Sequence, residues 1–253
     1  MRVLVVALSL LFPFPSFVPQ QTVTRDNQAV SLLQASISAM GNVPSDSTAS
    51  GSVVVTAGAS TSSGTVQILT RGTTQTSEQL ALSDSTQTTI FSNGAANLVQ
   101  DGTGQSLCLE RTASSQSVMF PLPFLAAALA NPDISLQFVG SETQGQHVRL
   151  WNTYSSNSFL QFLSDFTTTD IWLDSTTGLP NTISFTRRDS GGASSGTTIT
   201  ISYSNFQNAS GVAYPYSIQE SINGTSWATI TIQNVAFNTG LTDANFPVTQ
   251  GGN

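Results

Sequence analysis

The sequence predicts an α+β protein built on one antiparallel sheet. Three features carry the prediction: four segments in which apolar and polar residues alternate between Asp170 and Phe246, the short turns between them, and separate apolar stretches with helical spacing. Successive side chains of a strand point to opposite faces, so each alternating segment has one apolar and one polar face. That pattern is typical of a sheet with one buried and one solvated face. The four segments cover residues 182–186, 198–204, 214–219 and 228–233.

Turn signals between these segments favour antiparallel pairing. Asn223-Gly224 separates the last two segments, and this dipeptide readily takes the positive φ that a two-residue hairpin requires. The stretch from Asp174 to Gly178 predicts another turn, and the Gly/Ser-rich residues 189–196 predict a loop. Connections this short leave no room for the crossovers of a parallel sheet.

The first helix is expected between Asp26 and Gly41. Asp26 is a favourable residue at the start of a helix and Gly41 at its end. We interpret it as a helix that covers a sheet. The alternative is a helix lying on a membrane surface, which needs basic residues on its polar face, and this helix has almost none. The apolar positions at helical spacing are Val30, Leu33, Ile37 and Met40.

A polar loop over residues 42–50 and then a series of short strands are expected after this helix. Ser92-Asn93-Gly94 predicts a hairpin between the fourth and fifth strands. The expected strands are 52–56, 65–71, 77–82, 88–91, 96–99 and 106–110.

A second helix is expected from Phe120 to Ala130, where the chain is apolar throughout. Two prolines occupy its first turn, where proline is tolerated, and the Ala/Leu stretch favours a helix until Asn131-Pro132 ends it. Such a helix either plugs an open sheet or packs in an ordinary core.

A strand pair at 135–139 and 146–153 follows. A short third helix is then predicted by apolar residues at positions i, i+3, i+4 and i+7, namely Phe159, Phe162, Leu163 and Phe166.

The charge composition excludes one class of partner. The chain has 253 residues, of which 39% are hydrophobic and 8% charged, and its formal net charge is -7. All seven of its basic residues are arginines. Nucleic-acid binding needs clustered positive charge to contact phosphates, so the composition argues against a nucleic-acid partner.

Residues 1–20 are interpreted as a signal peptide. Arg2 supplies a short positive start, and Val3 to Phe12 is an apolar core too short to span a bilayer. We therefore expect an exported protein, periplasmic or extracellular, with a single domain over residues 21–253. A retained membrane anchor is the alternative.

Catalytic and metal-binding signatures do not stand out in the chain. His147 is the one histidine and Cys108 the one cysteine, so neither a typical zinc site nor an intrachain disulfide is available. The sequence contains no Gly-x-Ser-x-Gly elbow and no glycine-rich phosphate loop. Asp170 and Asp174, close to Asp165, are explained by turn and cap roles. We therefore predict no enzyme activity, no cofactor and no metal.

Several short motifs follow one another in the alternating segments. They are Ile171-Trp172-Leu173-Asp174, Thr177-Gly178-Leu179-Pro180, Ile201 to Phe206, Gly211 to Pro215, and Asn234 to Asn238 followed by Phe246. In this order and spacing they resemble the bacterial outer-membrane lipoprotein carrier superfamily (LolA/LolB-like) and its exported relatives. The resemblance is most specific over residues 170–246 and extends over residues 26–248.

The resemblance implies a strongly curved antiparallel sheet that forms an incomplete, or half, β-barrel, with short helices covering its concave face. In that family the concave face is apolar and receives acyl chains. The helix from Phe120 to Leu129 would then be a lid over an apolar cavity of the kind that small ligands favour. Cavity and lid would be formed by Phe120, Leu122, Phe124, Leu125, Leu129, Phe159, Phe162, Leu163, Ile201, Tyr203 and Ile230.

Two features depart from the carrier itself. Arg71 is the nearest counterpart of the arginine that is linked to cargo release in the carrier, but its surroundings match poorly, and a surface arginine is the other interpretation. The lipidated cysteine and the protruding apolar loop of the membrane-anchored acceptor are absent from this sequence. The sequence therefore indicates a divergent relative.

The predicted function is non-enzymatic binding of a lipid, an acyl chain or a lipidated partner protein in the half-barrel. We expect a monomer that makes at most transient membrane contact. The alternative is a structural or protein-interaction module of the cell envelope with a packed interior and no ligand. The charge-poor surface rich in Ser and Thr fits that alternative equally well.

Overall fold

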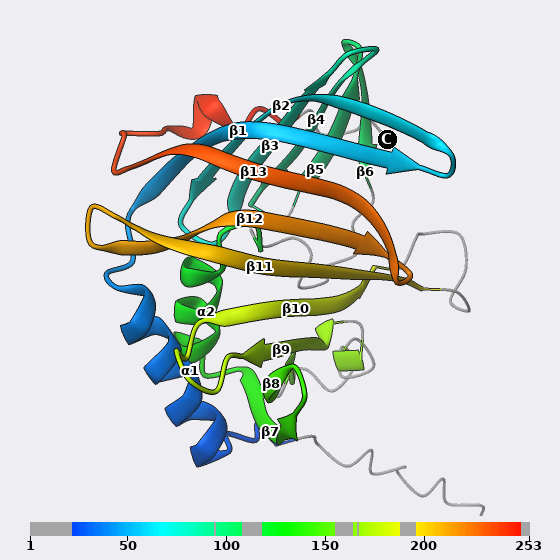
Figure 1. The fold of residues 1–253 in the computed structure, drawn as a ribbon. Coiled ribbons are helices and arrows are strands. Elements are labelled where there is room, and N and C mark those ends of the chain that lie inside the picture. Colours follow the sequence, from blue (N-terminus) through cyan, green and yellow to red (C-terminus); the bar gives the residue numbers. More distant parts are fainter. Residues whose placement is uncertain are drawn as a thin grey trace, which may run out of the picture.

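The computed structural model describes residues 22–93, 95–107, 118–154, 164–165, 167–187 and 196–248, without the side chains of 95–97, 104–107 and 187. Within these residues one antiparallel sheet of 13 strands dominates the molecule. Figure 1 shows the sheet arching across the molecule, with helix α2 behind its central strands. The sheet stays open, because its order ends at β6 on one side and β7 on the other.

The strands form two meanders that follow the chain. The first contains β1 (Asp46–Ala57), β2 (Ser60–Arg71), β3 (Gln75–Leu82), β4 (Thr86–Ser92), β5 (Ala95–Gln100) and β6 (Thr103–Leu107). The second contains β7 (Ile134–Glu142), β8 (Gly145–Asn152), β9 (Thr169–Leu173), β10 (Pro180–Arg187), β11 (Thr197–Ala209), β12 (Val212–Ile222) and β13 (Thr225–Phe237). The helical elements are α1 (Asn27–Met40), α2 (Pro121–Ala130) and the short 3-10 helix η3 (Asp243–Asn245).

The two meanders meet where β1 pairs with β13. The pairing runs from Ser47 opposite Phe237 to Val55 opposite Ala228, and its register shifts between Ser50 and Gly51. At Gly51 the two backbones come close together, since a Cβ atom there would lie 2.0 Å from the carbonyl oxygen of Thr231. A glycine is therefore required at the place where this seam bends.

One apolar core joins one face of the sheet to both helices. It includes Ile68 of β2, Ile201 of β11 and Ile230 of β13, together with Leu33 of α1 and Leu122 of α2. We call the face of the sheet that carries these isoleucines the concave face. The core therefore lies between the sheet and the two helices.

Helix α1 has the boundaries that its sequence predicts. Asp26 accepts hydrogen bonds from the backbone N–H groups of Gln28 and Ala29, and the N–H of Gly41 donates to the carbonyl of Ile37. Gly41 has φ 101°, a conformation that favours glycine. The Asn223-Gly224 hairpin, with φ 50° and 78°, is confirmed in the same way.

The prediction of a polar loop over 42–50 is wrong for its second half. Residues Asp46 to Ser50 form the beginning of β1. Asp, Ser and Ala do not favour strands, but here β2 and β13 pair with this stretch from both sides. Pairing with two neighbours thus overrides local preference.

Other predictions fall partly or wholly outside the described residues. This applies to Cys108, to residues 189–195 of the predicted loop and to residues 108–110 of the sixth strand. It also applies to the apolar positions of the predicted third helix, Phe159, Phe162, Leu163 and Phe166.

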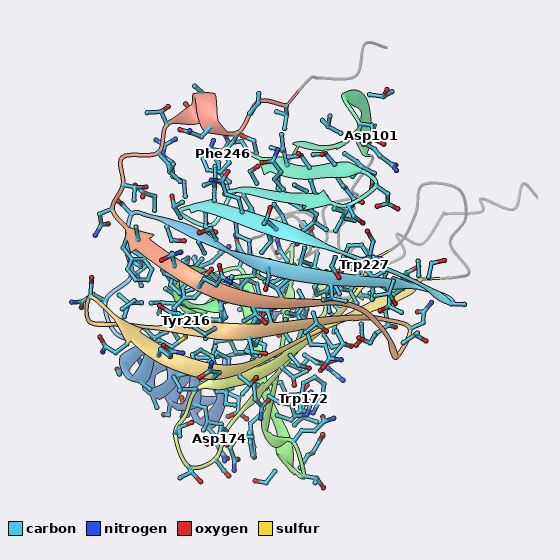
Figure 2. The ribbon with its side chains drawn as sticks, turned by 45° about the horizontal axis from the view of Figure 1, so that its top comes forward. Asp101, Trp172, Asp174, Tyr216, Trp227 and Phe246 are labelled. Atoms are coloured by element: carbon cyan, nitrogen blue, oxygen red, sulfur yellow. The ribbon has the colours of Figure 1, made fainter. Side chains whose placement is uncertain are left out.

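The C-terminal segment lies against the outer face of the first meander. Asp243 accepts hydrogen bonds from Arg71 at 2.6 Å and from Gln75 at 3.0 Å. Phe246 is buried beside these strands (Figure 2), although it does not belong to the main core. This segment therefore covers the face opposite to the helices.

Candidate ligand-binding face

The strand residues predicted to line the cavity all lie on the concave face. Ile201 and Tyr203 belong to β11 and Ile230 belongs to β13, and each is at most 4% exposed. They alternate with outward-facing residues, as a strand period of two requires. The predicted lining residues of the strands are thus brought together in one cluster.

The predicted lid residues cover this same face. Phe120, Leu122, Phe124 and Leu125 are buried in the cluster that contains the strand residues, and Leu129 is half-buried against it. The ring of Phe120 lies 4.8 Å from that of Tyr214 on β12. Phe159, Phe162 and Leu163 lie outside the described residues, so the structure does not place them. A role in ligand binding stays a prediction for all these residues.

An arginine holds the C-terminal end of α2, and sequence reasoning missed it. Arg25 donates hydrogen bonds from Nη2 to the carbonyl of Leu129 at 2.6 Å and from Nη1 to those of Asn131 at 2.9 Å and Ile134 at 3.3 Å. A cation at this end complements the helix dipole and the free carbonyl groups. The N-terminal end has no side-chain cap and instead carries Pro121 in its first turn. Nothing in the local sequence around Arg25 signals this distant contact.

Two carboxylic acids also face the concave side, and sequence reasoning missed them as well. Glu78 on β3 is paired with Ile68, and Glu220 on β12 is paired with Ile201, both buried isoleucines. The signal was present in the sequence, because Glu78 shares the parity of Leu80 and Glu220 shares the parity of Ile218. An acidic residue that shares the parity of the apolar residues of a strand is expected to face the core, where a carboxyl group is unusual.

Several polar atoms near these acids lack hydrogen-bond partners. Among the described residues, Oε1 of Glu78, Oγ1 of Thr76 and the hydroxyl of Tyr214 are buried and make no hydrogen bond. Tyr203, by contrast, donates its hydroxyl to the carbonyl of Val118, next to α2. Buried polar groups in native proteins are nearly always paired, so the three unpaired atoms require an explanation.

These groups interact electrostatically. Burial, together with the neighbouring Glu220, raises the pKa of Glu78 to about 8. Burial raises the pKa of Tyr214 strongly, with contributions from Tyr216 and Glu78, and it raises the pKa of Tyr203 with contributions from Tyr214 and Glu220. We call Glu78, Glu220, Tyr203, Tyr214 and Thr76 the interior polar cluster.

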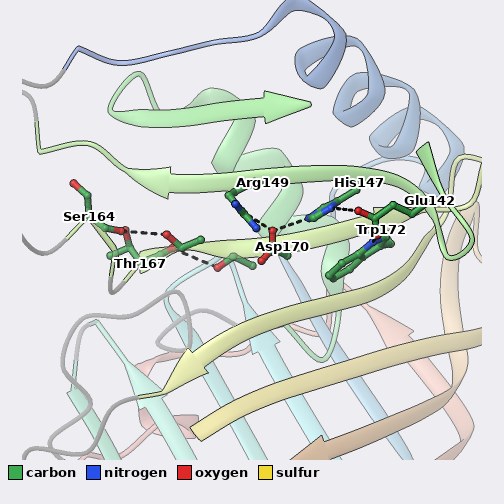
Figure 3. Close-up of polar contacts among 9 residues, drawn as sticks. Glu142, His147, Arg149, Ser164, Thr167, Asp170 and Trp172 are labelled. Atoms are coloured by element: carbon green, nitrogen blue, oxygen red, sulfur yellow. Dashed lines mark hydrogen bonds and ion pairs between the residues drawn. The ribbon is translucent and has the colours of Figure 1, made fainter. Parts of the chain in front are cut away.

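His147 belongs to a different polar group at the β7–β9 edge of the sheet. Figure 3 shows its ring between Glu142, 2.8 Å from Nδ1, and Asp170, 2.7 Å from Nε2. The ring also stacks on Trp172 with centroids 4.4 Å apart, and Arg149 donates to Asp170. Both ring nitrogens are occupied by carboxylates, so His147 is not arranged to activate a nucleophile. Its contacts instead tie three neighbouring strands together.

The remaining polar residues that the sequence singled out have structural contacts. Arg71 is paired with Asp243 of the C-terminal segment at 2.6 Å. Asp174 accepts hydrogen bonds from the backbone N–H groups of Thr176 and Thr177, and these bonds and that of the Thr177 hydroxyl lower its pKa.

Within the part of the chain that the structure describes, no group of three or more His, Cys, Asp or Glu residues is placed to hold a metal ion. No described helix is long and apolar enough to cross a bilayer.

Solved structures share this fold. A domain described as an outer-membrane lipoprotein-sorting protein from Vibrio parahaemolyticus has a TM-score of 0.52 at 12% identity, covering 87% of this chain and 96% of its own. A DUF1329-family protein from Desulfovibrio piger has a TM-score of 0.57 at 9% identity, covering 89% of this chain and 98% of its own. A LolA-superfamily protein from Nitrosomonas europaea has a TM-score of 0.54 at 14% identity, covering 87% of this chain and 97% of its own.

Because the sequence identities to these structures are this low, the likeness establishes the fold alone. No protein-family model and no curated protein sequence matches the chain. The molecule has the LolA-like fold: an open, curved antiparallel sheet with helices on one face. The predicted fold class and the resemblance to the lipoprotein carrier superfamily are confirmed at this level.

Proposed function

We propose that this protein is an exported, non-enzymatic carrier that holds a hydrophobic ligand between the concave face and α2. The ligand would be a lipid, an acyl chain or the acyl group of a lipidated partner protein. The observation that carries the proposal is the cover of the concave face. That cover consists of α1 and the short helix α2, and the apolar side chains of α2, Leu122 and Leu125 among them, pack into the core on this face of the open sheet.

The proposed mechanism is an exchange of apolar contacts. Helix α2 would leave the concave face, and an acyl chain would take its place against residues such as Ile201 and Ile230. Burying each methylene of the chain contributes about 0.8 kcal/mol, so a long chain can offset the lost packing of the helix. In this proposal residues 1–20 are removed as a signal peptide, and residues 21–253 act as a monomer in the periplasm or outside the cell, with at most transient membrane contact.

A packed structural or interaction module remains the second candidate. It is favoured by the nearly complete burial of Phe120, Leu122 and Leu125, which already fill the concave face in this structure. The two candidates differ in whether α2 can be displaced.

The first test is native mass spectrometry of residues 21–253 purified from a host with membranes, together with an apolar fluorescent probe. A carrier should show added mass that organic extraction identifies as lipid, and the delipidated protein should brighten the probe. A bare polypeptide mass after incubation with mixed lipids, with a probe that stays dim, would reject the carrier.

The second test weakens the cover. Leu129→Ser removes part of the contact between α2 and the core, which is worth about 0.5–1 kcal/mol for a half-buried leucine. Because the ligand competes with α2 for the concave face, the apparent affinity for the probe should rise by roughly two- to fivefold. Leu125→Ser should act in the same direction, although it also removes a fully buried side chain. The matched control is Ala130→Ser on the exposed side of the same helix. Equal affinities in the Leu129→Ser and Ala130→Ser variants would argue against displacement of α2.

A further inference from the structure

Three residues with hydroxyl groups lie side by side at one end of the concave face. Ser47 on β1 is opposite Thr70 on β2, and Thr70 is opposite Thr76 on β3. Residues directly opposite each other in paired strands point to the same face of the sheet, and Ile68, two residues before Thr70, belongs to the core on the concave face. All three are at most 4% exposed. We call Ser47, Thr70 and Thr76 the hydroxyl row.

The hydroxyls at both ends of this row have no hydrogen-bond partner among the described residues. Oγ of Ser47 and Oγ1 of Thr76 are buried and unpaired. Oε1 of Glu78, two residues after Thr76 and on the same face, is unpaired as well. Buried polar groups are nearly always paired, because leaving one unpaired is costly. Neighbouring unpaired oxygens on one face therefore point to a polar group that a ligand supplies.

The beginning of α2 covers this end of the concave face. Phe237 of β13 is opposite Ser47, and the ring of Phe120, which precedes the first turn of α2, lies 5.8 Å from that of Phe237. The ring of Tyr214 lies 4.8 Å from Phe120 and 6.1 Å from Phe237, and its buried hydroxyl is also unpaired. The displacement of α2 that the proposed function requires would therefore expose the hydroxyl row.

An apolar strip leads away from the hydroxyl row along the same strands. The next residues of β2 on the concave face are Ile68 and Val66, and Val66 is opposite Leu80 of β3. On β1 the strip continues to Val53. These four side chains are at most 2% exposed. This part of the concave face is therefore apolar along its length and carries hydroxyls at one end, which is the pattern that an amphiphile matches.

A charged headgroup would find no counter-ion at this end among the described side chains. Arg25 binds the C-terminal end of α2, Arg71 forms its ion pair on the opposite face of the sheet, and Arg149 forms one at the β7–β9 edge. Burial raises the pKa of Glu78 to about 8, with a contribution from Glu220, so at neutral pH its carboxyl group is an uncharged donor. Burying a charge without a partner is costly, so the site favours an uncharged headgroup.

We propose that the ligand of the concave face is an uncharged amphiphile whose headgroup carries hydroxyls, and that this headgroup binds Ser47 and Thr76. The inference rests on the proposed carrier function and names the headgroup that the site accepts. A hydroxyl both donates and accepts, so a headgroup with two hydroxyls can satisfy the unpaired oxygens in either direction. The alkyl chain lies along the apolar strip. A carboxylate or an ammonium headgroup is disfavoured, because its charge would be buried without a partner.

The test compares four ligands with chains of equal length as competitors of the apolar fluorescent probe: 1-monodecanoylglycerol, methyl decanoate, decanoate and decylamine. We expect the glycerol ester to displace the probe at a roughly tenfold lower concentration than the methyl ester, because only the glycerol ester can form the additional hydrogen bonds. Both charged ligands should be weaker than the glycerol ester. Equal displacement by the two esters, or tighter binding of a charged ligand, would overturn the headgroup assignment and leave the carrier function standing. Failure of all four to bind would reject both.

Variants of the row assign the preference to its hydroxyls. Ser47→Ala and Thr76→Val should each reduce the preference for the glycerol ester by about threefold and leave the affinity for methyl decanoate unchanged. Unchanged binding of methyl decanoate also shows that each variant is folded. The matched control is Thr65→Val, the same change at an exposed position of β2. A loss of preference in Thr65→Val as large as in Thr76→Val would overturn the inference.

The stability of the ligand-free protein provides an independent measurement. Because the hydroxyl of Thr76 has no partner, Thr76→Val should leave the midpoint of urea unfolding unchanged or raise it. A lower midpoint would show that the hydroxyl is already hydrogen-bonded in the free protein and would contradict the inference.

Two sources of this headgroup chemistry are separated by one further ligand. Decyl glucoside carries a sugar where 1-monodecanoylglycerol carries glycerol. Tighter binding of either ligand than of methyl decanoate supports the inference, and the tighter of the two identifies the source. If neither binds more tightly than methyl decanoate, the hydroxyl row does not recognise a headgroup and the inference fails.

Discussion

Glu78 holds its proton in the folded protein up to about pH 8, because burial and the nearby Glu220 raise its pKa. In the unfolded chain it ionises near its ordinary value of 4.5. Between these two values the folded state binds more protons than the unfolded state, so stability falls as the pH rises. Glu78 thus stabilises the fold least under mildly alkaline conditions.

This gives a prediction at the scale of one residue. Glu78→Gln should raise the free energy of unfolding by about 2 kcal/mol at pH 8.5 and by much less at pH 4.5. The figure lies below the full value of the pKa shift because Glu78 keeps partial contact with solvent. Urea unfolding of both proteins at the two pH values measures the difference. The same gain at both pH values would show that the ionisation of Glu78 is not its cause.

Single residues differ in how far the sequence reveals them. Asp26 and Asn223-Gly224 act through neighbours in the chain, and their roles were predictable from local rules. Glu78 was recognisable by its parity within an apolar row. Arg25 was not, because its hydrogen-bond partners are more than a hundred residues away. Local patterns predict local contacts, and the anchoring of α2 is a distant one.

Helix α2 is the element on which the proposed function depends, and Arg25 is its anchor. Arg25→Gln should weaken three hydrogen bonds to backbone carbonyls, which together stabilise the closed helix by about 1–3 kcal/mol. We expect faster amide hydrogen exchange in α2 and little change in β10 to β13. Mass spectrometry of deuterated peptides measures both.

Another arginine provides the control for this variant. Arg149→Gln also removes a charged hydrogen bond, but it does so at the β7–β9 edge, where Arg149 contacts Asp170. It should leave exchange in α2 unchanged. If both variants accelerate α2 equally, the effect is a general loss of stability and Arg25 is not a specific anchor.

Most elements were predictable, because their residues alternate or repeat at the expected period. Strands β7, β8 and β10 to β13 and both helices follow from the pattern and from the turns that separate them. The first half of β1 was not predicted, because Asp46 to Ser50 is mostly polar and contains, apart from Thr48, no residue that favours strands. It becomes a strand because β2 and β13 both pair with it, and that information is not contained in the segment itself.

The whole molecule depends on the seam between β1 and β13. Gly51→Ala would place a methyl group 2.0 Å from a backbone oxygen, so the two strands must move apart. We expect a loss of about 2–4 kcal/mol in the free energy of unfolding. Ser52→Ala, the next residue on the opposite face, should change it by less than about 0.5 kcal/mol. Denaturant unfolding of the two variants checks this, and similar stabilities would show that the seam tolerates a side chain.

The seam is also the part of the architecture that the alternating pattern does not predict. Ser45 and Asn238 are hydrogen-bonded at one end of it although 193 residues separate them. Periodicity indicates strands and their turns but does not say which distant strands pair. The curved, open form of the sheet was expected only through the resemblance to a known family, and the solved structures of that fold confirm it.

The order of the strands has a consequence for how the chain is made. Every strand pair except β1 with β13 joins neighbours in the sequence, so the hairpins can form soon after each one is synthesised. β1 pairs with β2 early, but its other edge stays unpaired until β13, the last strand of the described chain, has emerged. That edge includes Val53, Val54 and Val55, and an exposed apolar edge readily pairs with other chains. A chain interrupted before β13 would keep this edge free, and a helper protein that shields it during synthesis and export would protect the molecule from aggregation.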